Sequence, residues 1–298
     1  MRGRPGWSAP GPGYRVPGYI RYLDLRGRMG PEVAIETASA PARVRHAEPV
    51  MGTVVSFDVP VTAEQDGSLR AAVEWLHWVD RVFSPYRPDS DVTRLADGAV
   101  TLDGCAPELA EVADACAFVA ELSGGYFTDR PSGRYDPTGY VKGWAVERAA
   151  AILSAAGSVS HLVNGGGDVQ CAGGRPLAGA GAAATVPWRV GIADPFRAGQ
   201  LALVVDAVDC GVATSGTAER GAHIVDPLAG RPAAGLASIT VTGPSLALAD
   251  AFATAAFAMG PDRARAWTEA LDGYHAFAIT EDGQTWHTSG FATPITAG

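Results

Sequence analysis

The alternation of apolar and polar positions divides the chain into short strands and amphipathic helices. Residues 54–59 follow a period of two through the run Val-Val-Ser-Phe-Asp-Val, which is typical of a half-buried strand, and we expect ordered structure to begin just before it, near Pro49. Residues 64–83 instead repeat apolar side chains at helical spacing. The sequence therefore predicts a strand followed by a helix at the start of the folded part.

The rest of the chain continues to mix the two patterns. Helices are expected at residues 107–122, which open with proline and end before a Gly-Gly pair, at 142–156, across the apolar run after Ser245, and at 261–271. Short strands are expected at residues 161–163, 169–171, 188–192, 201–205, 212–214, 239–242 and 274–280. The Gly/Ala-rich residues 173–186 favour a loose surface loop.

This order of elements indicates a fold class. Helices and strands are interspersed with hairpin-like turns, which favours an α+β protein with mixed or antiparallel sheets packed against helices rather than strict βαβ alternation. Residues 1–47 are rich in Gly, Pro and Arg, so we expect a disordered tail or an over-called translation start, with Met29 as another candidate initiator. Residues 48–298 are expected to form a single domain.

Composition and charge exclude several classes of protein. The 298 residues are 47% hydrophobic and 18% charged, as in an ordinary globular protein, and the net charge is −9 with a pI near 5.1. A non-specific nucleic-acid binder would be basic, so we expect no nucleic-acid partner. No apolar stretch reaches the ~18 residues of a membrane span, and no secretory signal or lipidation cysteine is visible. The expected location is cytoplasmic.

The four cysteines are scattered and form no CxxC pair. Cys105, Cys116, Cys171 and Cys210 are therefore interpreted as small buried apolar residues rather than as metal ligands or a disulfide framework.

One polar pair stands out in the last long apolar helix. Asp250 and Thr254 are four residues apart in a run that is otherwise almost wholly apolar, so the two side chains lie one above the other on the same helix face. They present two hard oxygen ligands to one point. A buried carboxylate needs a compensating charge, and a small hard cation such as Mg²⁺ is a natural partner.

A second candidate is the segment Tyr-Asp136-Pro-Thr-Gly139-Tyr-Val-Lys142-Gly-Trp. The Asp-Pro pair opens a turn, Gly139 permits close backbone approach, and a helix starting near Lys142 would direct its free amides and a mobile positive charge toward an anion. The alternative is an ordinary capped helix start with a solvated lysine.

Two further segments could carry chemistry. The three glycines of Asn164-Gly-Gly-Gly-Asp168 would let a ligand touch the backbone, but no helix follows them, so a Rossmann assignment fails; a plain hairpin turn is the alternative. His223 stands beside an Asp-Pro turn and shortly after Ser215-Gly216, where a neutral imidazole could accept a proton from a hydroxyl. A structural or exposed histidine is the alternative there.

Taken together, these motifs resemble one family. Met51-Gly-Thr, Phe-Ser-Pro-Tyr86, Asp136-Pro-Thr-Gly-Tyr-Val-Lys-Gly143, Asn164-Gly-Gly-Gly-Asp168, Thr-Ser215-Gly216, His223-Ile-Val-Asp-Pro and Ala-Asp250 to Thr254 occur in the order found in the FAD:protein FMN transferases, the ApbE family. The resemblance covers about residues 48–282 and implies the fold of that family.

The resemblance also implies an activity. Members bind FAD and Mg²⁺, cleave the FAD pyrophosphate, and attach FMN to a threonine or serine hydroxyl of an acceptor flavoprotein with release of AMP. By similarity, the metal would be held by the Asp250 carboxylate, the Thr254 hydroxyl and backbone oxygens near Gly139 and Ala253, and His223 would deprotonate the acceptor hydroxyl. Contacts with FAD would come from Met51, Tyr86, Tyr126, Phe127, Thr128, Asp136, Lys142, Ser215, Gly216 and Ile224.

Two departures from the family pattern concern the flavin contacts. The family commonly has a Phe-Asp pair after Gly-Gly, whereas this chain has Tyr126-Phe127-Thr128 with Asp129 one place later, and the segment from Phe127 to Asp136 is short. Two other functions stay open at this point: a Mg²⁺-dependent FAD pyrophosphatase that gives FMN and AMP, and a non-catalytic FAD-binding protein.

Overall fold

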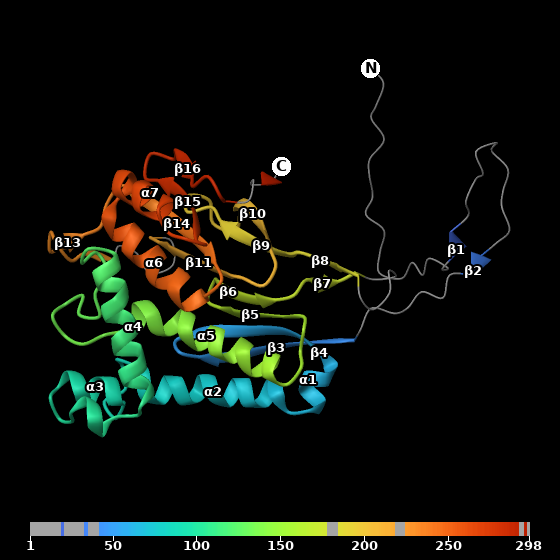
Figure 1. The fold of residues 1–298 in the computed structure, drawn as a ribbon, viewed down its shortest axis with the longest axis horizontal. Helices are drawn as coiled ribbons and strands as arrows, with labels where there is room; N and C mark the ends of the chain where they lie inside the picture. The colour runs from blue at the N-terminus through green and yellow to red at the C-terminus, as the bar shows by residue number, and fades with distance from the viewer. Residues whose placement is uncertain are drawn as a thin grey trace, which may run out of the picture. The chain divides into compact units, whose positions relative to one another are not determined.

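The computed structural model describes residues 19–20, 33–34, 42–177, 184–217, 224–291 and 295–296 (Figure 1). The chain divides into two compact units. The first comprises residues 1–40 and 177–184, and its described elements are two short strands, β1 (Tyr19–Ile20) and β2 (Val33–Ala34), which pair antiparallel. The second comprises residues 41–176 and 185–298 and holds all the other described helices and strands.

An eight-stranded antiparallel sheet forms the centre of the second unit. Its order is β16 (Thr285–His287), β15 (His275–Thr280), β14 (Leu236–Gly243), β11 (Gly211–Gly216), β6 (Asp168–Ala172), β5 (His161–Gly165), β4 (Thr53–Pro60) and β3 (Arg43–Val50). Every neighbouring pair runs antiparallel. This arrangement, with helices packed on the sheet, confirms the α+β expectation.

Strand β3 shows that the folded part begins earlier than the sequence predicted. β3 begins at Arg43, before the boundary placed at residue 47, and pairs with β4 over its whole length. The Arg43 guanidinium binds the Asp58 carboxylate, with Nε 2.5 Å from Oδ1. The strand was missed because its sequence, RVRHAEPV, is too polar to give an apolar signal of its own.

Seven α-helices occur in the described part of the chain. They are α1 (Val61–Gln65), α2 (Ser68–Phe83), α3 (Asp91–Ala96), α4 (Glu108–Leu122), α5 (Thr138–Ala155), α6 (Leu246–Met259) and α7 (Pro261–Glu269). The single helix expected over 64–83 is broken because Gly67 adopts a left-handed φ of 80°. No described helix is long and apolar enough to cross a membrane.

A smaller sheet covers part of the large one. It has the order β17 (Ile295–Thr296), β10 (Leu201–Ala207) and β9 (Trp188–Ala193). Two short hairpins add β7 (Arg175–Pro176) with β8 (Thr185–Val186) and β12 (Val225–Asp226) with β13 (Arg231–Pro232). The segment expected to be a loose loop, residues 173–186, therefore contains a strand pair at its ends, and residues 178–183 lie outside the described part.

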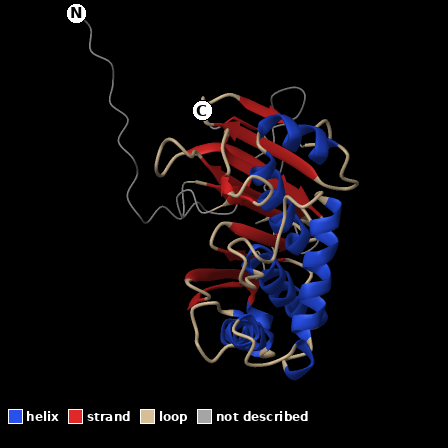
Figure 2. Cartoon of the chain, turned by 90° about the vertical axis from the view of Figure 1, so that its left-hand side faces the viewer, coloured by secondary structure: helices blue, strands red, loops and turns tan. Residues whose placement is uncertain are grey.

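The large sheet separates two hydrophobic cores. Alternate residues of β11 face opposite sides, so that Ala213 belongs to the core beneath the helices whereas Val212 belongs to the core beneath β9 and β10. On the helical side, α5 lies over β5 and β6, and α6 lies over β11 and β14. Figure 2 shows these helices on one side of the strands. The central strands are thus covered on both faces.

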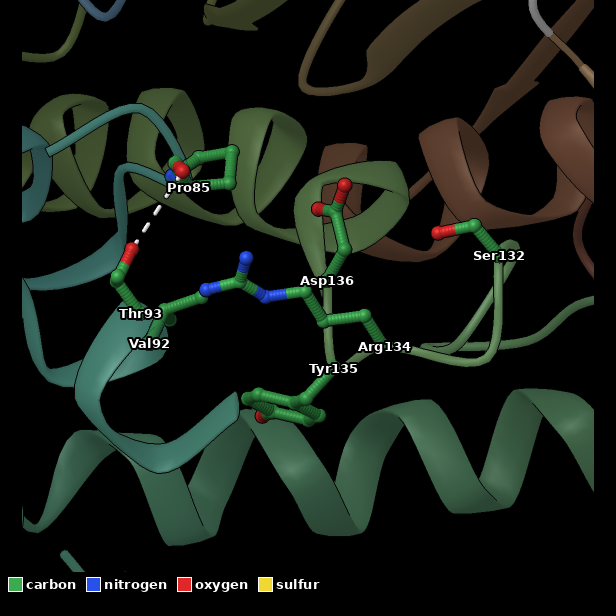
Figure 3. A pocket seen from close by; sticks show the side chains of 7 residues that line it. All are labelled: Pro85, Val92, Thr93, Ser132, Arg134, Tyr135 and Asp136. Carbon is green, nitrogen blue, oxygen red and sulfur yellow. Dashed lines mark hydrogen bonds between the residues drawn. The ribbon is translucent and has the colours of Figure 1, made fainter. Parts of the chain in front are cut away.

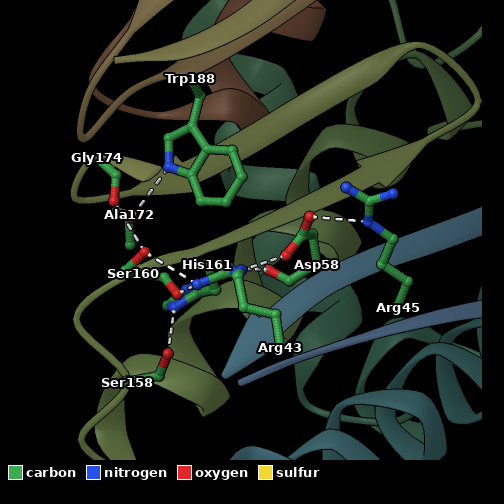
Figure 4. Close-up of polar contacts among 9 residues, drawn as sticks. All are labelled: Arg43, Arg45, Asp58, Ser158, Ser160, His161, Ala172, Gly174 and Trp188. Carbon is green, nitrogen blue, oxygen red and sulfur yellow. Dashed lines mark hydrogen bonds and ion pairs between the residues drawn. The ribbon is translucent and has the colours of Figure 1, made fainter. Parts of the chain in front are cut away.

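His161, at the start of β5, is a fully buried titratable group (Figure 4). Its Nδ1 lies 2.9 Å from the Ser158 hydroxyl, and the Arg43 guanidinium is among the groups nearby. Burial, which disfavours the charged imidazolium, lowers the pKa of His161 from 6.5 to about 4. The native protein therefore keeps this ring neutral through the mildly acidic range.

The buried His161 ring predicts acid sensitivity. Between pH 6.5 and 4 the unfolded chain binds a proton at this position that the native protein does not, so the free energy of unfolding should fall as the pH falls, by about 3 kcal/mol in all. Urea unfolding from pH 7 to 4 would measure it. His161→Gln should show a shallower dependence, while His287→Gln, which alters an exposed ring, should keep the wild-type slope. Equal slopes for wild type and His161→Gln would contradict the assignment.

Candidate active site at the contact between two helices

Helix α5 begins earlier than the sequence predicted. It starts at Thr138 rather than near Lys142, because Pro137 ends the turn and the Asp136 Oδ1 accepts a hydrogen bond of 3.1 Å from the Thr138 amide. The Lys142 amide therefore lies inside the helix and is not available to an anion. Gly139, by contrast, lies in the first turn.

Lys142 makes a defined ion pair. Its Nζ is 2.7 Å from Oδ2 of Asp168, the first residue of β6, and the Asp168 side chain is only 1% exposed. Oδ1 of Asp168 accepts a hydrogen bond of 3.1 Å from the amide of Thr214 in β11. The expected mobile or solvated lysine is thus wrong: a buried carboxylate holds the ammonium beside the sheet.

Asp250 joins α6 to α5. Its side chain is 4% exposed, and Oδ2 accepts a hydrogen bond of 3.0 Å from the backbone amide of Gly143. A Cβ on Gly143 would lie 2.7 Å from the Leu246 carbonyl oxygen and 2.8 Å from the Asp250 Cβ. Glycine is therefore the residue that allows the two helices to approach at this point.

A second carboxylate on α5 fixes the start of α6. Oε2 of Glu147 accepts hydrogen bonds from the Ser245 hydroxyl at 2.7 Å and from the Ala247 amide at 2.8 Å. The Ser245 hydroxyl in turn caps the helix by accepting from the Leu248 amide at 3.3 Å. A negative charge at a helix N-terminus is favourable, so these contacts set the position of α6 along α5.

Thr254 lies one turn beyond Asp250, among three other residues named by the sequence. Its Oγ1 is 3.4 Å from Oγ of Ser215, at the end of β11. A Cβ on Gly139 would lie 3.7 Å from the Thr254 Cγ2 and 3.3 Å from the ring of Phe127. The structure therefore brings Gly139, Phe127, Ser215 and Thr254 together.

The possible metal ligands near Asp250 and Thr254 are all oxygen atoms. Among the described residues, no group of three or more His, Cys, Asp or Glu side chains is placed to hold a metal. The α5–α6 contact offers instead the carboxylate of Asp250, the hydroxyl of Thr254 and backbone oxygens, and the adjoining end of β11 adds the hydroxyl of Ser215. One carboxylate with neutral oxygens suits Mg²⁺, which retains positions for water and phosphate, so these residues fit that ion.

A small cavity lies before the start of α5. It has a volume of about 80 Å³ and is lined by Pro85, Val92, Thr93, Ser132, Arg134, Tyr135 and Asp136 (Figure 3). Arg134 on its wall is paired with Asp97, Nη2 to Oδ1 2.8 Å. Tyr86, next to Pro85, is 91% exposed. Asp136 and Tyr86 thus lie near the same cavity rather than at the Asp250 contact.

Two hairpin turns meet where strand β4 begins and the neighbouring strand β5 ends. Met51 and Gly52 connect β3 to β4 with φ of 56° and 69°, and Gly166 and Gly167 connect β5 to β6 with φ of 62° and 99°. A Cβ on Gly166 would lie 2.6 Å from the Thr53 Oγ1, so the turns touch. The glycine run is therefore a hairpin turn, and the exclusion of a Rossmann site is confirmed.

The other predicted residues are placed as follows. Phe127 is buried, whereas Tyr126, Thr128, Gly216 and Ile224 are half-buried, and Ile224 packs against the helical core. Ala253 is fully buried in α6. His223 belongs to residues 218–223, which lie outside the described part of the chain.

Three residues of this site were not singled out individually from the sequence. Asp168 carries the counter-charge for Lys142, Gly143 binds Asp250, and Glu147 caps α6. Asp168 and Gly143 stand within the motifs that the sequence highlighted, so their roles had a signal. Glu147 had none, because its partners are about 100 residues away.

The sequence of this chain is similar to those of known enzymes. The chain is 32% identical over 188 residues to the FAD:protein FMN transferase of Rhodobacter capsulatus, covering 57% of this chain and 34% of that protein. It is 35% identical over 165 residues to the enzyme of the same name from Treponema pallidum, covering 52% and 46%. The matched segment thus spans less than half the length of these relatives.

Solved structures share the fold. The ApbE protein of Thermotoga maritima superimposes with a TM-score of 0.71 at 22% identity, over 83% of this chain and 97% of that one. The flavin transferase ApbE of Vibrio cholerae gives 0.68 at 22%, over 84% and 98%. The sequence model of the ApbE family matches residues 51–129 and 128–278, which is most of the chain. The chain belongs to the ApbE family.

Proposed function

We propose that this protein is a Mg²⁺-dependent FAD:protein FMN transferase, which attaches FMN to a threonine or serine hydroxyl of an acceptor flavoprotein and releases AMP. The observation that carries the proposal is the buried Asp250 carboxylate at the α5–α6 contact, one turn from Thr254. Membership of the ApbE family and the similarity to proteins named FAD:protein FMN transferase support the same reaction.

The metal would be held by oxygen atoms from both helices. Asp250 and Thr254 would be side-chain ligands, and backbone oxygens near Gly139 and Ala253 would complete the protein's share. When bound, Mg²⁺ would neutralise the pyrophosphate and the charge on departing AMP. The Gly143 amide keeps the Asp250 carboxylate oriented by its hydrogen bond of 3.0 Å.

Lys142 would supply a fixed positive charge to the phosphates of FAD. Its side chain is 25% exposed, and the pair with Asp168 holds its Nζ at the beginning of β6. Because Asp168 also accepts from the Thr214 amide, the ammonium is tied to the same strand that carries Ser215. Preorganised charge of this kind requires little rearrangement during the reaction.

The remaining FAD contacts would lie around this centre. Asp136 stands at the cavity before α5, and exposed Tyr86 beside it would have its ring available to a flavin. Further contacts are proposed for Met51, Tyr126, Phe127, Thr128, Ser215, Gly216 and Ile224.

In the transfer, the acceptor oxygen would attack the phosphorus of the FMN half. The bond from that phosphorus to the bridging oxygen would break, and AMP would leave with that oxygen. We assign the proton of the acceptor hydroxyl to His223, on the resemblance of His223-Ile-Val-Asp-Pro to the family motif. With the leaving-group charge balanced, the protein's other task is to align the reacting groups.

Product analysis tests the proposed function. Incubation with FAD, Mg²⁺ and an acceptor flavoprotein domain should give covalent, fluorescent FMN on the acceptor and an equal amount of AMP. Free FMN and AMP without labelled acceptor would indicate a pyrophosphatase. A stable stoichiometric FAD complex without AMP would indicate a flavin-binding protein, and either result would end the transferase proposal.

Asp250 is best tested with an isosteric change. Asp250→Asn removes the charge but keeps an oxygen that can accept from Gly143, so folding should survive while transfer falls on the order of 10²–10³-fold at low Mg²⁺. The measurements are AMP release across a Mg²⁺ titration and urea unfolding. Asp250→Ala should also lose turnover. Wild-type activity of Asp250→Asn at low Mg²⁺ would show that Asp250 is not a ligand.

His223 is tested by separating FAD binding from transfer. His223→Ala should bind FAD as the wild type does and slow transfer by about 10²–10⁴-fold, which is the usual contribution of a general base. Equilibrium binding of FAD and single-turnover labelling of the acceptor give the two values. An unchanged transfer rate would remove His223 from the mechanism.

A further inference from the structure

Cys171 lies in β6, and Cys210 directly precedes β11. The register pairs Gly211 with Gln170 and Val212 with Val169, and one residue beyond this pairing Cys210 lies opposite Cys171. The Cys171 amide donates a hydrogen bond of 3.1 Å to the Cys210 carbonyl oxygen, and the Cys171 thiol lies 3.2 Å from that oxygen. Side chains of directly opposite residues project from the same face.

This placement is compatible with the geometry of a disulfide. Opposite residues in antiparallel strands have Cα atoms about 4.5–5.5 Å apart, within the range of about 4.4–6.8 Å that disulfides span. Both thiols are free in the structure. Both also border the core beneath β9 and β10, where Cys171 is 1% exposed and Cys210 is half-buried.

The pKa values of the two thiols are shifted in opposite directions. A hydrogen bond with the Cys171 side chain lowers the pKa of Cys210 below its ordinary value. The same interaction, together with burial, raises the pKa of Cys171. Because the thiolate is the nucleophile in disulfide exchange, the more accessible Cys210 is suited to attack first and Cys171 to follow.

We propose that Cys171 and Cys210 form a reversible disulfide bond by exchange with a small-molecule disulfide. The Cys210 thiolate attacks one sulfur of the oxidant, forming a mixed disulfide and releasing one thiolate. Cys171 then loses its proton and attacks the Cys210 sulfur, which releases the second thiolate. Two protein thiols are oxidised, and one disulfide molecule is reduced to two thiols.

The bond would join the two strands that carry the charged centre of the site. Asp168 opens β6, three residues before Cys171, and Thr214, whose amide binds Asp168, follows Cys210 by four residues on β11. Oxidation would therefore lock the pairing of β6 with β11. Formation of this bond depends only on the positions of Cys171 and Cys210, and not on the proposed transferase activity.

Thiol counting and peptide mapping test the proposal. The reduced full chain is incubated with oxidised glutathione, then denatured, alkylated and digested. Two of the four thiols should disappear, and the peptides containing Cys171 and Cys210 should be linked. Cys105→Ser should behave like the wild type, since Cys105 lies outside the pair, whereas Cys210→Ser should form no intramolecular bond. Four persisting thiols, a stable glutathione adduct at Cys210, or a link to Cys105 or Cys116 would overturn the proposal.

Thermal unfolding provides a second readout. The bond would close a loop of 39 residues, so oxidised wild type should melt roughly 5–10 °C above the reduced protein. Added dithiothreitol should abolish the difference. Oxidised and reduced Cys210→Ser should melt together. A wild-type melting temperature that is unchanged by a mapped bond would contradict the locking of β6 to β11.

Discussion

The close approach of α5 and α6 at Gly143 is the constraint on which the site depends. A side chain at this position would meet the backbone of α6, and the freed space is used by the hydrogen bond from the Gly143 amide to Asp250. Glu147, one turn further along α5, holds the start of α6 by two hydrogen bonds. The orientation of the buried carboxylate therefore follows from how two helices pack, not from a flexible loop.

The two buried carboxylates near this contact, Asp250 and Asp168, are both bound by consecutive residues of α5. Asp250 accepts a hydrogen bond from the Gly143 amide of α5, while Lys142, which directly precedes Gly143, is paired with Asp168 on β6. Consecutive residues of α5 thus serve two different carboxylates, one on a helix and one on the sheet. Each carboxylate also takes a backbone amide, which is the compensation that buried charges require.

The sequence predicted the local features well because their causes are local. The i, i+4 spacing of Asp250 and Thr254 places both oxygens on one helix face wherever the helix packs, and the structure places Ser215 and Gly139, two other residues named from the sequence, beside Thr254. The hairpin at Gly166-Gly167 also followed from short-range conformational preferences. The alternation of apolar residues was sufficient to predict the α+β class.

The features that were missed depend on strand pairing and turn contacts, which the spacing of apolar residues does not show. Strand β3 is polar and is held by pairing with β4 and by Asp58. Helix α5 starts four residues early because Pro137 and the Asp136 carboxylate provide a better N-terminus than the turn expected near Lys142. The cross-strand neighbours Cys171 and Cys210 share no motif, so only the register of the sheet places them together.

Strand β11 illustrates how little freedom the centre of this fold has. Ala213 and Ser215 face the helices, whereas Val212 belongs to the core on the opposite side. A one-residue deletion near its start would interchange the two faces along the whole strand. Ser215 would then face an apolar core and Gly216 would take its place beside Thr254, so insertions and deletions in this lineage should be confined to the loops that flank the strand.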